Sequence, residues 1–210
     1  MSKLYEQLKE AVLEGNVKEA SRLTQEALNE GNQPKDIIDN ALVEAMNEVS
    51  ALFKEGELYV PEVLMSAQAT AAGMDIIKPL LKEGDVKNKG TVVFCTVKGD
   101  LHDIGKKLCC MLMESAGYKV VDLGVDVGPQ QMIDAIKVNN ASILGMSAML
   151  TTTMVTMQDA VDALKENGLY GNIKVMVGGA PLSPQYAGEI GANYSSDATG
   201  AVELANRLMA

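Results

Sequence analysis

The segment GDLHDIGKKL, from Gly99 to Leu108, carries the residue types in this chain that are best suited to metal chemistry. Its histidine, His102, is the only one in the sequence; Asp100 precedes it by two residues and Gly105 follows it by three. Asp100 is placed to accept the Nδ1 proton of His102, which would leave Nε2 free to bind a metal. One histidine without a thiolate cluster cannot form a zinc site, which needs three or four protein ligands. The segment therefore predicts either the ligand of a metal already held in a macrocycle, or a histidine at a helix N-terminus that only hydrogen-bonds to a nearby carboxylate.

The cysteines and the net charge argue against several other kinds of site and partner. Cys95, Cys109 and Cys110 are odd in number and form no CxxC pair, so we expect small apolar packing residues in a reducing compartment rather than disulfides. A net charge of −10 argues against nucleic acid, whose phosphates need stripes of Lys and Arg. The sequence contains no run of about 18 apolar residues, so no membrane partner is expected. The N-terminus lacks the apolar segment of a signal peptide, and we expect a cytoplasmic protein.

The second half of the sequence alternates between strand and helix patterns, which predicts a parallel sheet with crossover helices. Apolar runs such as TVVFCTV predict strands that are buried on both faces. The predicted strands are Thr91–Val97, Lys119–Leu123, Ser142–Ser147, Lys174–Val177 and Ala192–Tyr194. The predicted helices are Ile104–Ala116, Gln130–Asn139, Val155–Asn167, Ser183–Ile190 and Ala198–Met209. The fold class is therefore α/β, with a doubly wound five-stranded parallel sheet of the flavodoxin or Rossmann type.

The unusual residues of this half all follow predicted strands. Because ligands of such sheets bind at the carboxyl ends of the strands, near the switch in strand order, we expect these loops to form one site. They are the GDLHDIG loop, Ser147–Met154, Gly178–Ser183 and Tyr194–Ala198.

The first half of the sequence is helical throughout. Four amphipathic stretches end at glycines or begin near prolines, which predicts a four-helix antiparallel bundle. Pro79 is expected to bend the end of the fourth helix. The polar stretch Lys82–Gly90, which contains two glycines, is predicted to be a linker that acts as a hinge. We therefore expect a helical domain over residues 1–85 and an α/β domain over residues 90–210.

These motifs resemble those of a known family. DLHDIG is similar to the DxHxxG signature of corrinoid-binding domains. Three further motifs follow in the family's order, namely the serine-rich loop at Ser147–Thr153, the double glycine Gly178-Gly179 and ANYSSDA at residues 192–198. The segment ELYVPEVLMSAQ, at residues 57–68, resembles the helical cap that covers cobalt in methyl-carrying corrinoid proteins. The chain thus resembles the cap plus cobalamin-binding domains of methionine synthase. It departs from the family pattern at Thr153, where Ser is frequent, and at Met149, which replaces the Leu of a Ser-x-Leu motif.

The resemblance implies a cofactor and a set of residues that bind it. Cobalamin or a related corrinoid would bind with its lower base displaced, and His102 would take the axial place below cobalt. Asp100 and Thr153 would form a proton relay behind His102, and the displaced tail would pass along Gly178-Gly179. Tyr59, Val63 and Met65 would form an apolar roof. The resemblance assigns the remaining cofactor contacts to Asp103, Ile104, Gly105, Ser147, Met149, Leu150, Thr151, Tyr194 and Asp197.

The same resemblance implies a carrier of methyl groups on cobalt. Its partners would be a substrate-specific methyltransferase, a second, methylcorrinoid-dependent methyltransferase that serves a thiol or folate acceptor, and a reductive activation protein. Two alternatives are the small cobalamin subunit of a carbon-skeleton mutase and a cobalamin-sensing regulator, although neither explains an acidic four-helix cap. A flavodoxin-like domain that holds an anionic ligand at a helix N-terminus is a further alternative. The sequence leaves the methyl donor open, with a slight preference for methylated amines.

Overall fold

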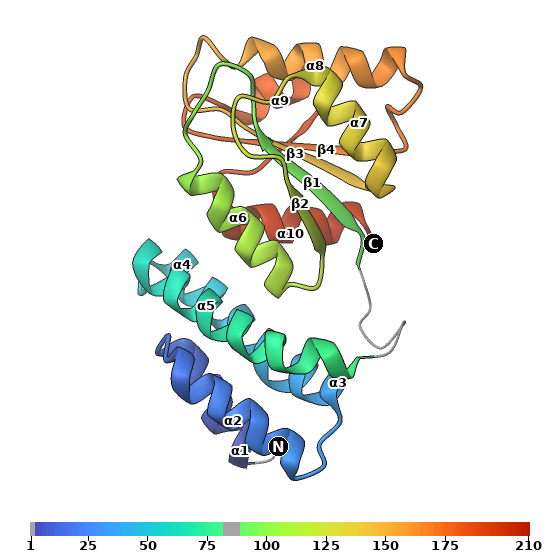
Figure 1. Ribbon diagram of the computed structural model, residues 1–210. Coiled ribbons are helices and arrows are strands. Elements are labelled where there is room, and N and C mark those ends of the chain that lie inside the picture. Colours follow the sequence, from blue (N-terminus) through green and yellow to red (C-terminus); the bar gives the residue numbers. More distant parts are fainter. Residues whose placement is uncertain (1–2, 82–88) are drawn as a thin grey trace. The chain divides into compact units, whose positions relative to one another are not determined.

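The computed structural model describes residues 3–81 and 89–210 of the chain. These residues divide into two compact units, a helical unit and a sheet unit (Figure 1). The predicted linker falls mostly on residues 82–88, which lie outside the described residues. Within the described residues, none of the helices combines the length with the apolar character that a bilayer crossing requires.

The helical unit confirms the predicted four-helix arrangement. It contains α1 (Lys3–Leu13), α2 (Val17–Asn29), a third helix and α5 (Val60–Ile77). The third helix consists of α3 (Pro34–Ile37), a π-helical stretch η1 (Ile38–Val43) and α4 (Glu44–Glu55). The π-helical stretch was not predicted, because apolar residues recur along it at nearly the spacing of an α-helix.

The end of α5 changes where the sequence predicts a bend. The regular helix stops at Ile77, and the 3₁₀ segment η2 (Lys78–Leu80) contains Pro79. Proline lacks the amide hydrogen that would continue the helical hydrogen bonds, so it tightens or ends the helix here.

The sheet unit confirms the predicted α/β fold. Its strands are β1 (Thr91–Thr96), β2 (Lys119–Asp122), β3 (Ile143–Ser147), β4 (Lys174–Gly178) and β5 (Asn193–Tyr194). All neighbouring strands are parallel, in the order β2-β1-β3-β4-β5. Figure 1 shows helices on both faces of the sheet. One face carries α6 (Ile104–Ser115) and α10 (Ala198–Leu208), and the other carries α7 (Pro129–Asn139), α8 (Val155–Glu166) and α9 (Pro184–Ile190).

The strand order places the candidate site. β1 and β3 are neighbours, although β2 and α7 lie between them in the sequence. The chain leaves β1 toward one edge of the sheet and leaves β3 toward the other, so the loops after these two strands meet at the switch point. Every residue of β1 is buried, which fixes the start of the loop that carries His102.

Candidate functional site

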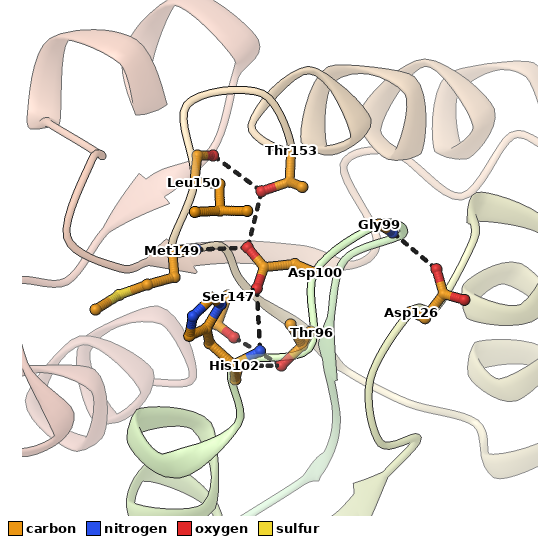
Figure 2. Close-up of polar contacts among 9 residues, drawn as sticks. All are labelled: Thr96, Gly99, Asp100, His102, Asp126, Ser147, Met149, Leu150 and Thr153. Atoms are coloured by element: carbon orange, nitrogen blue, oxygen red, sulfur yellow. Dashed lines mark hydrogen bonds and ion pairs between the residues drawn. The ribbon is translucent and has the colours of Figure 1, made fainter.

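Asp100 lies in the loop that follows β1 and is the centre of a hydrogen-bonded cluster (Figure 2). Its Oδ1 accepts the backbone N–H of His102 at 3.0 Å and lies 2.7 Å from Nδ1 of the same residue. Its Oδ2 accepts the backbone N–H of Met149 at 2.7 Å and the hydroxyl of Thr153 at 2.8 Å. The predicted contacts of Asp100 with His102 and with Thr153 are therefore both present.

These contacts determine the charge of Asp100 and the tautomer of His102. Burial by itself raises the pKa of Asp100, but the hydrogen bonds from Met149, His102 and Thr153 outweigh burial and hold this pKa well below its usual range. An ionised carboxylate only accepts hydrogen bonds, so Nδ1 of His102 must donate. In the neutral imidazole, Nε2 is then left with its lone pair. The His102 side chain is 57% exposed, so the ring is open to a ligand.

We predict that Asp100→Asn disturbs this cluster and lowers cofactor affinity or activity by about 10–100-fold. The amide would turn an NH2 group toward N–H and O–H groups that now donate to the carboxylate, and it could no longer fix the tautomer by charge.

The pH dependence of unfolding distinguishes the charge of Asp100 from the size and shape of its side chain, because asparagine has nearly the same shape but no charge. Because the folded-state pKa is lowered, Asp100 stabilises the wild type above about pH 4, its unfolded value, and this stability is lost as pH falls toward the folded value. A wild-type chain and an Asp100→Asn chain with the same acid dependence would contradict the role of charge.

Thr96, which belongs to none of the sequence motifs, supports the histidine loop from inside the sheet. Its hydroxyl donates to the backbone oxygen of His102 at 3.0 Å and lies 3.0 Å from the hydroxyl of Ser147 (Figure 2). Thr96 is fully buried at the end of β1, and Ser147 is its register partner on β3. Its hydroxyl at the end of a mainly apolar strand is a weak sequence signal, because Thr91 places a second hydroxyl at the start of the same strand.

A cavity of about 410 Å³ opens beside His102 within the sheet unit. Its lining is mainly apolar and includes Phe94, Met146 and Met176 from neighbouring strands. Many of the predicted contact residues line it, and they are His102, Asp103, Ile104, Gly105, Ser147, Met149, Gly178, Gly179 and Asp197.

Other predicted contact residues lie elsewhere in the sheet unit. Leu150 and Thr151 are exposed, and neither lines the cavity. The backbone oxygen of Leu150 instead lies 2.9 Å from the Thr153 hydroxyl, whose single proton it shares with Asp100. Tyr194 is half-buried and packs against the core cluster that contains Val177 and Ile190. Leu150, Thr151 and Tyr194 therefore lie close in sequence to residues of the cavity wall, but they do not line the cavity themselves.

The three residues predicted for a roof differ in exposure. Tyr59 is 71% exposed and Met65 is 50% exposed, so both side chains are available to a ligand or partner. Val63 is fully buried in the helical unit, and the prediction that it faces a ligand is corrected: it belongs to the core. Val63 falls on the same side of α5 as Ala67 and Thr70, which are also buried, because residues at this spacing share one face of a helix.

The double glycine has a role within the protein fold. A Cβ at Gly179 would lie 1.9 Å from the backbone oxygen of Ala148, and Gly179 adopts φ of 134°, which L-residues rarely do. The resemblance places the displaced tail of the corrinoid along this turn, but at Gly179 the space of a side chain is taken by the loop after β3. Gly178 and Gly179 nevertheless line the cavity.

Cys95 and Cys110 are buried, as expected of packing residues, and Cys109 is half-buried. Burial raises the pKa of Cys95, Cys109 and Cys110 to about 12 in each case, so the thiols stay protonated at neutral pH. Cys109 also lines the cavity. No three His, Cys, Asp or Glu side chains within residues 3–81 and 89–210 are grouped so that they could hold a metal ion by themselves. A metal bound at His102 would therefore have to bring most of its ligands with it, as a macrocycle does.

Comparisons with known proteins match both units. Residues 4–78 and residues 90–204 each match a family model described as a B12 binding domain. A corrinoid protein of Desulfitobacterium hafniense is 39% identical over 98% of this chain and 97% of its own. Dimethylamine corrinoid protein 1 of Methanosarcina acetivorans is 43% identical over 84% of each chain. In the methanol:cobalamin methyltransferase complex MtaBC from Methanosarcina barkeri, one chain superposes with a TM-score of 0.90 at 32% identity, over 99% of this chain and 80% of that one.

Proposed function

Because the chain belongs to the family of B12-binding corrinoid proteins that carry methyl groups, we propose that it binds a corrinoid through His102 and passes a methyl group between two partner enzymes. The bound corrinoid would supply a cobalt ion that accepts and gives up the methyl group. The domain of residues 90–210 would hold the corrinoid, and the domain of residues 1–85 would act as its cap.

The observation that carries this proposal is the geometry of His102. Its Nδ1 is 2.7 Å from the buried Asp100, and its exposed ring stands beside an apolar cavity. A ligating imidazole needs this arrangement, in which a second group holds one ring nitrogen and leaves the other free. These residues would therefore fit a corrinoid whose lower base is displaced, and His102 would be the residue that holds its cobalt.

Asp100 and Thr153 would adjust how strongly Nε2 of His102 binds during methyl transfer. Asp100 holds the proton at Nδ1, and the Thr153 hydroxyl donates to the same carboxylate. We propose that Asp100 draws this proton closer or releases it as the demand on Nε2 changes, with Thr153 stabilising the negative charge. The apolar cavity would take the displaced tail of the corrinoid, and its apolar walls would bury that tail away from water.

The names of the relatives support the proposed partners. They are a dimethylamine corrinoid protein and a protein of a methanol:cobalamin methyltransferase complex. A substrate-specific methyltransferase is therefore the partner expected to place the methyl group on this chain's corrinoid. We propose that a second methyltransferase removes the methyl group to a thiol or folate acceptor, and that a reductive activation protein restores the corrinoid after oxidation. Neither relative bears the name of a mutase subunit or a regulator, and a methylated amine remains our preferred donor.

An absorption spectrum tests the proposal. The purified chain is incubated with hydroxocobalamin and desalted, and the eluted protein is expected to be coloured, with the spectrum of a histidine-ligated corrinoid. Trial methylation with dimethylamine and methanol methyltransferases then identifies the donor. A colourless eluate would overturn the proposal.

Gly105 offers a prediction that separates ligand binding from folding. A Cβ at Gly105 would meet no protein atom within 4 Å, yet Gly105 lines the cavity. We therefore expect Gly105→Ala to keep the free energy of unfolding within about 0.5 kcal/mol of the wild-type value. The variant should bind hydroxocobalamin roughly 10-fold more weakly or worse, because the added methyl group would occupy space that the bound corrinoid fills.

A matched control exists at Gly188 on α9. A Cβ there also meets nothing within 4 Å, but this exposed residue is not part of the cavity wall. Gly188→Ala should leave binding unchanged and raise the free energy of unfolding by up to about 1 kcal/mol, because alanine is the better helix former. Equal corrinoid affinities for the two variants, measured by spectroscopic titration, would contradict a role for Gly105 in the binding site.

A further inference from the structure

Asp126 makes contacts that neither the sequence motifs nor the cavity explain. It lies in the loop between β2 and α7, and it is one of two non-glycine residues with positive φ among the described residues, at 56°. Its Oδ1 accepts the backbone N–H of Gly99 at 2.7 Å (Figure 2). Its own backbone N–H donates to the backbone oxygen of Asp100 at 3.1 Å.

These two hydrogen bonds hold a tight turn in the histidine loop. The N–H of Asp100 donates to the backbone oxygen of Val97 at 3.1 Å, which closes a four-residue turn. Gly99 is the third residue of this turn and has φ of 84°, the sign that a type II turn requires. The Asp126 carboxylate accepts from the Gly99 N–H and the Asp126 backbone N–H donates to the Asp100 oxygen, so Asp126 stabilises the turn from the neighbouring loop.

The backbone anchors Asp126 to the same strand from which the turn emerges. Val127, the next residue, pairs with Val97 as a parallel bridge, and its N–H donates to the oxygen of Thr96 at 3.1 Å. The N–H of Thr96 in turn donates to the oxygen of Gly124 at 2.9 Å. The loop after β2 thus extends the pairing of β1 and presents Asp126 at a fixed height above the sheet.

Two demands meet at this position. The residue must tolerate a left-handed backbone, which Asp and Asn do better than other L-residues. Its side chain must also reach the Gly99 N–H as an acceptor. Asn satisfies both demands, glycine satisfies only the first, and alanine satisfies neither.

We infer that Asp126 is a positioning residue for His102, acting through the turn that carries Asp100. It touches neither His102 nor the cavity, so its contribution is to orient the Asp100 carboxylate that fixes the imidazole. The inference deepens the proposed function and rests on it only for the consequence in the corrinoid-bound state.

Nuclear magnetic resonance of the full chain without corrinoid tests the positioning. Because His102 is the only histidine, its ring nitrogens give signals that need no further assignment. In the wild type we expect separate signals for a protonated Nδ1 and an unprotonated Nε2. In Asp126→Gly we expect averaged signals and exchange of the Gly99 amide hydrogen that is faster by roughly 10-fold or more, since a hydrogen bond to a charged group is lost.

Two further variants complete the test. Asp126→Asn keeps both the backbone tolerance and an acceptor oxygen, so it should retain the wild-type signals. Asn140→Gly removes the other non-glycine residue with positive φ, at the end of α7, and should leave His102 unchanged. Wild-type His102 signals in Asp126→Gly would overturn the inference, even if the Gly99 amide exchanged faster. Averaged signals in Asp126→Asn would overturn it as well.

The corrinoid-bound chain separates this inference from the proposed function. If both hold, Asp126→Gly lowers methyl transfer by roughly 10-fold and shifts the spectrum of bound hydroxocobalamin away from the histidine-ligated form, and Asp126→Asn restores both. If His102→Ala leaves the wild-type corrinoid spectrum unchanged, the proposed function fails. The averaged imidazole signals of Asp126→Gly would then still support the positioning role.

Discussion

His102→Ala is expected to lower methyl transfer between the partner enzymes by more than roughly 100-fold, the upper end of the loss seen when only a supporting partner of a metal ligand is removed. The substitution removes the imidazole itself, while Asp100 keeps the donors from Met149, Thr153 and the backbone of residue 102. The measurement is the rate at which the corrinoid-loaded variant is methylated and demethylated by its partner methyltransferases. The absorption spectrum of the same sample reports the lower ligand.

The fold should survive this substitution. The His102 side chain is 57% exposed, so its removal creates no cavity in the core and the circular dichroism spectrum should stay that of the wild type. Free imidazole added to the variant should restore part of the spectrum and of the rate, because the space beside Asp100 is then vacant. Methyl transfer at the wild-type rate without imidazole would contradict the assignment of His102 as the axial ligand.

The main elements of the sheet unit are predictable from sequence because apolar runs indicate the strands and helical periodicity indicates the helices between them. The run TVVFCTV predicts a strand over Thr91–Val97, and the structure has β1 at Thr91–Thr96. The helix predicted to follow at Ile104–Ala116 is α6 at Ile104–Ser115. Strict alternation of such elements leaves few topologies, since crossovers between parallel strands are right-handed. The meeting of the loops after β1 and β3 then follows from the strand order.

The contacts that support the site are less predictable, because they depend on register. Thr96 reaches Ser147 only because Thr96 and Ser147 are paired across β1 and β3. Asp126 reaches Gly99 because the loop after β2 continues the pairing and then adopts a positive φ. A sequence shows residue types and local periodicity, and neither specifies which side chains of separate loops face each other.

Val63 illustrates the same limit in the helical unit. A motif resemblance placed it beside Tyr59 and Met65, but only those two side chains are exposed. The direction of a side chain around α5 depends on which face packs against the other helices. The helix is apolar on most sides, so its periodicity does not single out the buried face.

Gly179→Ala is expected to have the largest effect on the fold of the sheet unit. A Cβ at this position would lie 1.9 Å from the backbone oxygen of Ala148, and no rotation of a side chain can relieve a clash with backbone. The loop after β3 would have to move, and this loop carries the Met149 and Thr153 donors to Asp100. We expect a loss of about 3 kcal/mol or more in the free energy of unfolding and loss of hydroxocobalamin binding.

Gly168→Ala separates the steric clash from the cost of positive φ. Gly168 has φ of 67°, and a Cβ there would meet no atom within 4 Å, so its substitution carries backbone strain alone, about 1 kcal/mol. Thermal unfolding followed by circular dichroism measures both variants, and spectroscopic titration measures their corrinoid affinity. If Gly179→Ala were no more destabilising than Gly168→Ala, the loop after β3 would be free to shift. The contact between Ala148 and Gly179 would then not determine where the Met149 and Thr153 donors stand.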